Sequence, residues 1–246
     1  MLTEGLYQKY IDNDCIEVWN KISFLDFSKL SPDDQEEIHK IILETLTRLD
    51  YNFQMIFAVL DKEGFVYENI GGSNFKNKRY GLRPSEQYRN FVEKYNSALA
   101  ESKIPLLLSA FWSYFEVVDF RGKFNFDVQF FLDPLFIESP DFAEVEDIIF
   151  WTTVDFQETP YIMFSPDEYH KEDVSGGEGP GIIIRENATV DYYIINYKEE
   201  ETLTFLDYLR MCVEWANMPS LQFFSDEERA GFEIILESVR SQIKPF

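Results

Sequence analysis

Residues 31–49 read SPDDQEEIHKIILETLTRL, and this stretch predicts a helix from its first residues onward. Ser31 supplies an N-cap hydroxyl, Pro32 suits the first helical position, and two aspartates follow in the first turn. Apolar side chains then recur at the spacing of one helix face, at Ile38, Ile41, Ile42, Leu46 and Leu49. The stretch therefore predicts an amphipathic helix with one face in a core.

The middle of the chain has the patterns of strands. Residues 54–60 and 65–70 flank the sequence DKEG at 61–64, which has glycine where a turn needs positive φ, so we expect a β-hairpin. Ser85 then predicts the start of another helix. Apolar and polar residues alternate over 124–130, which predicts a half-buried antiparallel strand.

The C-terminal part returns to helical patterns. Residues 202–216 place their apolar side chains on one side, and Ser225 predicts the cap of a last helix. Strands are not regularly interleaved with helices, so we expect an α+β fold with a mainly antiparallel sheet flanked by helices at both ends of the chain. A single domain over 1–246 accounts for the length. Asp133-Pro134 could instead divide it into residues 1–133 and an acidic part, 134–246.

Composition excludes several classes of protein. With 45% hydrophobic and 17% aromatic residues, the chain can bury a substantial core. No apolar run is long enough to cross a bilayer, and the first residues lack the pattern of a signal peptide. Cys15 and Cys212 have no metal-binding spacing and are expected to be buried, reduced thiols. We expect a cytoplasmic protein that does not bind membranes.

Negative charge is concentrated in one stretch. Residues 133–201 contain 18 Asp and Glu against Lys171, Arg185 and Lys198, and so carry 15 of the chain's 23 net negative charges. Aromatic and β-branched runs such as 161–164 thread through the stretch, unlike a disordered acidic tail. We therefore expect the acidic groups on a folded surface, which would attract a basic partner and repel nucleic acid and anionic lipid.

Motifs for catalysis are almost absent. The chain has no GxGxxG, GxxxxGK[ST], GxSxG, HExxH or CxxC, and its two histidines are His39, expected to be solvent-exposed, and His170. In DEYHKED at 167–173, a helix would place Asp167, His170 and Asp173 on one side, where they could hold a divalent ion and activate water. A solvated turn explains the same run. We expect no enzyme, cofactor or metal, with a metal-dependent hydrolase as the alternative.

The densest glycine cluster is SGGEGPG at 175–181. Phosphate loops need glycine amides at a helix start, but here a strand follows and Glu178 lies inside the loop. The cluster therefore predicts a hairpin connection or a partner-contacting loop.

A set of short motifs lies in the C-terminal part: FSPDEYHK at 164–171, SGG at 175–177, an isolated Asp191, TFLDYLR at 204–210, Trp215 and Pro219. Together they resemble the bacterial proteins of the SUKH superfamily. This resemblance implies an α+β fold and the neutralisation of polymorphic toxins, many of them nucleases, by binding rather than by turnover.

Charge and resemblance lead to the same hypothesis. A nuclease toxin presents a cationic cleft, which an acidic protein can occupy in place of nucleic acid. We therefore expect a non-enzymatic immunity protein with a basic partner, the cognate toxin, and with aromatic anchors. The candidate partner-binding residues are Asp167, Glu168, Tyr169, Glu172, Asp173, Glu178, Tyr192 and Tyr193. Strand alternation predicts that Tyr192 and Tyr193 face opposite ways, so that at most one of them is an anchor. A small-ligand-binding domain is a further alternative.

A basic cluster interrupts the acidic character: Lys76, Lys78, Arg79, Arg83 and Arg89. It could contact a phosphate backbone, or the acidic half of this chain or of a second copy. Because the chain as a whole repels polyanions, we expect self-association as a homodimer and no nucleic-acid binding.

Overall fold

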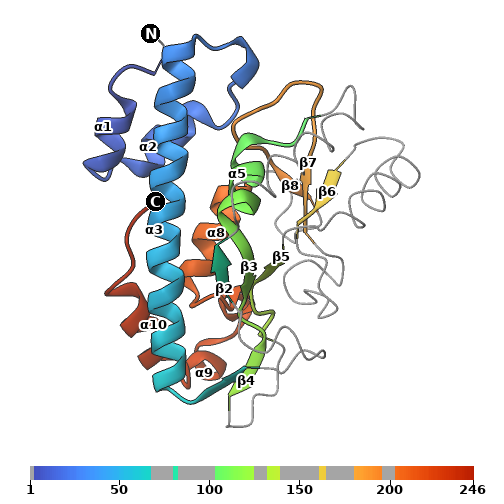
Figure 1. The fold of residues 1–246 in the computed structure, drawn as a ribbon. Coiled ribbons are helices and arrows are strands. Elements are labelled where there is room, and N and C mark those ends of the chain that lie inside the picture. The colour runs from blue at the N-terminus through green and yellow to red at the C-terminus, as the bar shows by residue number, and fades with distance from the viewer. Residues whose placement is uncertain are drawn as a thin grey trace.

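The structure is a computed structural model that describes residues 3–67, 80–82, 103–124, 132–138, 161–164, 180–195 and 203–246 (Figure 1). Its helices are α1 (Leu6–Ile11), α2 (Cys15–Ile22), α3 (Pro32–Lys62), α5 (Leu106–Tyr114), α8 (Phe205–Glu214), α9 (Asp226–Arg229) and α10 (Glu233–Arg240), with short 3-10 helices η1 (Phe27–Lys29) and η2 (Pro219–Phe223). Its strands are β1 (Phe65–Tyr67), β2 (Tyr80–Leu82), β3 (Phe115–Asp119), β4 (Gly122–Phe124), β5 (Phe136–Glu138), β6 (Tyr161–Met163), β7 (Gly181–Ile183) and β8 (Ile194–Ile195). The predicted α+β class, with helices at both ends of the chain, is confirmed.

Helix α3 begins where the sequence predicts. The Ser31 hydroxyl accepts a hydrogen bond from the Asp34 backbone N–H, and Pro32 occupies the first turn. All five apolar positions of the predicted face are buried. The helix runs for 31 residues and extends along one side of the molecule (Figure 1).

The predicted hairpin is wrong, because residues 54–60 belong to α3 and the strand β1, which lies within the predicted 65–70, pairs with β4 instead. Phe53, Ile56 and Leu60 are buried at the spacing of a helix face. Gly64 has a φ of 77° and follows the helix end, where the Glu63 backbone N–H donates to the Val59 carbonyl. Glycine at positive φ ends helices as readily as it turns hairpins, so the same residue fitted both structures.

The strands that the structure describes form three small antiparallel sheets. Their orders are β1-β4, β2-β3-β5 and β6-β7-β8. The predicted strand at 124–130 has only its first residue, Phe124, within the described part of the chain, where it closes β4. The helix predicted from Ser85 lies outside the described residues. The strand runs 161–163 and 181–183 pair as β6 and β7, and the Phe164 backbone N–H donates to the Pro180 carbonyl at 3.3 Å.

A cluster of buried side chains joins elements from both sides of Asp133–Pro134. On α3, Phe53 contacts Phe115 and Phe120 of the middle region, with ring centroids 5.6 and 5.9 Å apart. On α8, the Phe205 ring lies 5.5 Å from that of Phe111 and 4.8 Å from that of Phe164. The first residue of α8 is thus packed between α5 and the residue that follows β6.

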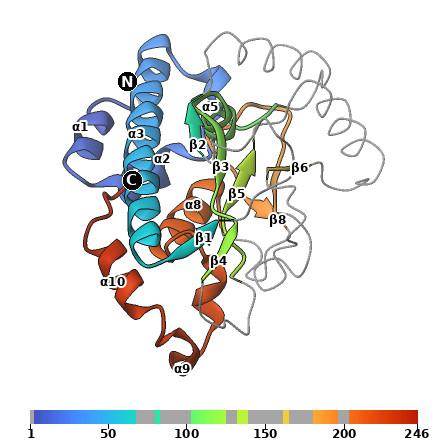
Figure 2. The same ribbon diagram turned by 60° about the horizontal axis from the view of Figure 1, so that its bottom comes forward.

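The predicted last helix is two helices. Ser225 and Glu228 form a capping box at the start of α9, as the sequence predicts. The helix ends at Arg229, and α10 begins only at Glu233, after Gly231. Glycine weakens a helix interior, and this explains the break. Helix α10 and the C-terminal residues then lie alongside α3 in both views (Figures 1 and 2).

Within the described ranges, no helix combines the length and apolar character that crossing a bilayer requires.

Candidate functional site

Six of the eight candidate partner-binding residues lie outside the described residues: Asp167, Glu168, Tyr169, Glu172, Asp173 and Glu178. His170 and the basic cluster from Lys76 to Arg89 lie outside them too, apart from 80–82. Among the residues that the structure places, no group of three or more His, Cys, Asp or Glu side chains is arranged to hold a metal ion. The site is therefore built from Tyr192, Tyr193 and their surroundings.

The acidic stretch is not wholly a surface feature. Asp133 is 2% exposed and Asp191 is fully buried, so the expectation of surface carboxylates is wrong for these two residues. Glu186 is exposed, as expected. A carboxylate in the core needs hydrogen-bond donors, and for Asp191 those donors are backbone amides.

Asp191 holds three segments together. Its carboxylate accepts hydrogen bonds from the backbone N–H of Tyr192 at 2.8 Å and of Leu206 at 3.1 Å, and its own N–H donates to the Ser23 carbonyl at 2.7 Å. Burial raises the pKa of Asp191 to about 7, and the two backbone hydrogen bonds oppose this rise. The sequence showed Asp191 only as part of a motif. Asp191 joins the end of α2 to the start of α8 by hydrogen bonds, and these partners come together only in the folded chain.

Tyr192 and Tyr193 do not face opposite ways. Both rings contact Phe24, at centroid distances of 5.7 and 4.8 Å, and they lie 5.4 Å from each other. The prediction from strand alternation is wrong because β8 begins only at Ile194, while Tyr193 forms an isolated antiparallel bridge with Thr204 and Tyr192 lies in neither strand nor bridge. We call Phe24, Tyr192 and Tyr193 the aromatic cluster. Phe24 is 45% exposed and was not singled out from the sequence.

The two tyrosines have different neighbours. Tyr192 packs against the hydrophobic core, and the Arg185 guanidinium carbon lies 4.9 Å from its ring centroid. Tyr193, together with Phe24, lines a cavity of about 290 Å³ between the end of α2 and the start of α8. We call it the α2–α8 cavity; its lining residues are Trp19, Asn20, Ser23, Phe24, Tyr193, Thr204, Leu206, Asp207 and Arg210. Tyr193 is therefore the tyrosine that a ligand in this cavity would meet.

On its α8 side, the cavity is lined by the N-terminal part of that helix, which carries charged side chains. Thr204 and Asp207 form a capping box, in which the Thr204 hydroxyl accepts from the Asp207 N–H at 3.3 Å and the Asp207 carboxylate accepts from the Thr204 N–H at 3.4 Å. The other carboxylate oxygen of Asp207 pairs with Arg210 Nη1 at 3.2 Å. Arg210 Nε donates to the Phe246 carbonyl. The Asp207 side chain stays 40% exposed and remains available to a ligand.

A larger cavity of about 670 Å³ lies next to the first. Asn20 and Arg210 line both cavities. Its other lining residues are Asn13, Asp14, Cys15, Ile16, Glu17, Val213, Glu214, Arg240, Ile243, Lys244, Pro245 and Phe246. The volume falls in the range of small-molecule sites, and carboxylates and cations stand together on its walls.

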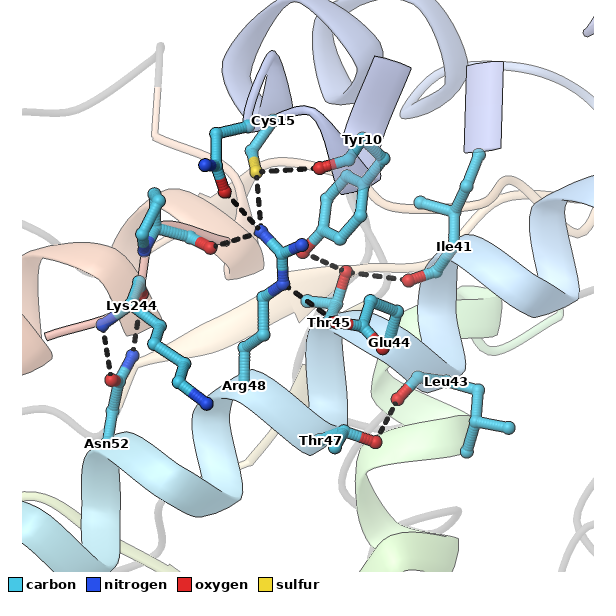
Figure 3. A network of polar contacts seen from close by, with 12 residues as sticks. Tyr10, Cys15, Ile41, Leu43, Glu44, Thr45, Thr47, Arg48, Asn52 and Lys244 are labelled. Atoms are coloured by element: carbon cyan, nitrogen blue, oxygen red, sulfur yellow. Dashed lines mark hydrogen bonds and ion pairs between the residues drawn. The ribbon is translucent and has the colours of Figure 1, made fainter. Parts of the chain in front are cut away.

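A buried polar network supports this cavity (Figure 3). The Arg48 guanidinium contacts Glu44 Oε1 at 2.9 Å, and its Nη1 donates to the Pro245 carbonyl at 2.9 Å and to Cys15 Sγ at 3.3 Å. Burial raises the pKa of the Cys15 thiol, while the positive charge of Arg48 opposes the rise. A raised pKa keeps the thiol protonated. Cys15 is thus a structural group, and the prediction that both cysteines are buried and free is confirmed.

No family model, curated protein or solved structure matches the chain.

Proposed function

We propose that the chain is a non-enzymatic immunity protein that neutralises a polymorphic toxin by occupying the basic active-site cleft of that toxin. The observation that carries this proposal is the charge distribution, with 18 acidic residues against three basic ones over 133–201. A fixed field of this sign steers a cationic domain into contact. The resemblance of the C-terminal motifs to the SUKH superfamily supports the same function.

Occlusion of the active site is a favourable way to inhibit a nuclease toxin, because its cleft is already suited to negative charge. The cationic cleft of such a toxin binds phosphates, and carboxylates on a folded surface occupy the same positions and release the same counterions. Charge supplies association rate more than affinity, so tight inhibition also needs desolvated aromatic anchors. Phe24 and Tyr193 are aromatic side chains at the rim of a cavity, and Glu186 is exposed nearby in sequence.

The direct test is neutralisation of a partner. If the proposal holds, a toxin encoded by the adjacent gene co-purifies with this protein and loses its activity in the complex. Reversal of acidic residues in pairs, Glu168→Lys with Glu172→Lys and Asp173→Lys with Glu178→Lys, should slow association by about tenfold at low salt and weaken its salt dependence.

A matched control separates local charge from total charge. The pair Asp61→Lys and Glu237→Lys makes the same change in net charge on exposed positions outside the acidic stretch. This control should associate at a rate near that of the unmodified protein. Equal slowing by all three pairs would contradict a localised interface, and a toxin that stays active in the presence of excess protein would refute the proposal.

The larger cavity favours a second candidate function, binding of a small molecule. Its 670 Å³ volume and its apolar wall of Ile16, Val213 and Ile243 suit an organic ligand, and the cations Arg210, Arg240 and Lys244 on its lining would attract an anionic group. Thermal-shift screening of small carboxylates would test this: a ligand that stabilises the protein but not an Arg210→Met variant would support it.

The metal-dependent hydrolase at Asp167, His170 and Asp173 stays a prediction. Elemental analysis of the purified protein, together with the effect of His170→Ala on any hydrolysis, would test it. Purified protein without metal, unchanged by His170→Ala, would end this alternative.

A further inference from the structure

We propose that the α2–α8 cavity binds one arginine side chain of a basic partner, with the guanidinium against Phe24 and Tyr193 and hydrogen-bonded to Asp207. The inference deepens the proposed function and rests on it for the identity of the partner. It concerns residues different from the acidic positions at 167–178.

The aromatic rings supply the first part of the argument. Phe24 and Tyr193 are tilted by 40° with centroids 4.8 Å apart, and Phe24 is 45% exposed, so ring surface faces the cavity and solvent. A planar guanidinium stacks on such surfaces more favourably than an ammonium group does. The same cluster already contacts a cation, since the Arg185 guanidinium carbon lies 4.9 Å from the Tyr192 centroid.

The polar groups of the cavity suit a donor-rich ligand. The Asp207 carboxylate, the Thr204 and Tyr193 hydroxyls and the Ser23 hydroxyl all offer acceptor oxygens, and a guanidinium offers five donors. The cavity adjoins the C-terminal end of α2, where the helix dipole favours a cation, and the N-terminal end of α8, where the Asp207 carboxylate offsets the opposite dipole.

The charge balance is favourable in spite of Arg210. Among the described residues that line this cavity, Arg210 is the one cation, and it is engaged by Asp207 Oδ1 and by the Phe246 carbonyl. The buried carboxylate of Asp191 lies behind the lining, bonded to the Leu206 and Tyr192 amides. Asp207 thus balances the charge of Arg210, in a chain whose net charge is −23.

Size points to a side chain and not to a whole small molecule. At about 290 Å³ the cavity falls just below the range of sites for drug-sized ligands. A single long side chain that enters from a protein surface fits this volume, and it buries its aliphatic stem against Trp19 and Leu206.

The test uses N-acetyl-arginine amide as the probe and its neutral isostere, N-acetyl-citrulline amide, as the matched control. Binding to the full chain is followed by NMR of labelled Phe and Tyr rings. We expect the arginine probe to shift the Phe24 and Tyr193 signals, and the citrulline probe to bind about tenfold more weakly or not at all. The lysine analogue should bind more weakly than arginine.

Variants assign the binding to the cavity. Phe24→Leu keeps an apolar side chain but removes the aromatic face, and Tyr193→Ala opens the wall; each should weaken arginine binding by roughly threefold or more. Phe223→Leu is the control, because Phe223 is similarly exposed, at 40%, and lies on neither cavity. Equal binding of arginine and citrulline, or unchanged binding by Phe24→Leu, would overturn the inference.

The same variants separate the two proposals. If a toxin is neutralised equally well by Phe24→Leu, Tyr193→Ala and the unmodified protein, the cavity inference fails and the proposed function stands. If the arginine probe binds as expected but no toxin is neutralised, the proposed function fails and the cavity remains a guanidinium site.

Discussion

Asp191 should make the stability of the protein fall as the pH rises through neutrality. Its pKa is raised from an ordinary 3.8 to about 7 by burial, so the folded protein holds this proton more tightly than the unfolded chain does. A raised aspartate pKa contributes stability that is complete below pH 3.8 and is lost as the pH rises through 7. The Asp191→Asn variant lacks this titration.

The size of the effect follows from the two pKa values. Between pH 5 and pH 8.5 the unfolded carboxyl is ionised throughout, while the folded one releases its proton near pH 7. The linkage relation then gives a loss of about 2.7 kcal/mol for the unmodified protein relative to Asp191→Asn over that interval. Asp191 is fully buried, so solvent screening does not reduce this figure.

Urea denaturation at several pH values from 5 to 8.5 measures this difference, since other titrating groups contribute equally to both proteins. Asp34→Asn is the control. Hydrogen bonds from Ser31 and from Thr3 lower the pKa of Asp34 to about 2, so Asp34 is ionised in both states over this interval and its variant should run parallel to the unmodified protein. If Asp191→Asn also runs parallel, the amides of Tyr192 and Leu206 outweigh burial and the reasoning is refuted.

Three further substitutions test the supports of the fold, each by urea denaturation. Arg48→Met removes the buried contacts to Glu44, Cys15 and Pro245 and should lower the free energy of unfolding by about 3 kcal/mol. Its control, Lys40→Met, breaks an exposed pair with Glu36 and should lower it by less than about 0.5 kcal/mol. Similar losses in both variants would contradict a special role for burial. Gly122→Ala should lower the free energy of unfolding by about 2 kcal/mol, because the added Cβ would lie 2.6 Å from the Val66 carbonyl oxygen. In the control, Gly231→Ala, the added Cβ meets no atom within 4 Å, and stability should change by less than about 1 kcal/mol in either direction. Thr204→Ala removes the cap of α8 and should cost about 1 kcal/mol; no loss would mean that Asp191 alone satisfies the helix start.

Local signals correctly predicted two helix starts, at Ser31 and Ser225, because an N-cap depends on a hydroxyl and on amides two or three residues away. The helix predicted over 202–216 begins later, at Phe205, with Thr204 as its cap. The start of a helix is thus encoded over one turn of sequence. The end of α3 at Lys62 is not encoded locally, because DKEG at 61–64 is compatible with both a helix terminus and a hairpin. Only the buried face of residues 53–60 distinguishes the two structures.

The candidate site was only partly accessible from sequence. The acidic residue close to Tyr193 predicts a partner contact, and the structure places Tyr193 on a cavity, but Phe24 lies 169 positions away in the chain. The contact between Phe24 and Tyr193 depends on the hydrogen bonds of Asp191, which join the end of α2 to the start of α8, and on the irregular backbone before β8. Such long-range juxtaposition leaves no periodic signal in the sequence.

The attachment of the C-terminal residues to α3 has a consequence for synthesis in the cell. Arg48 Nη1 donates to the Pro245 carbonyl, and Asn52, which is fully buried, exchanges hydrogen bonds with the backbone of Lys244. These polar groups of α3 emerge from the ribosome almost 200 residues before their partners do. Prematurely terminated chains would keep Arg48 and Asn52 without these partners, and unsatisfied buried groups destabilise a fold. Quality-control proteases should therefore remove incomplete chains more readily than complete ones.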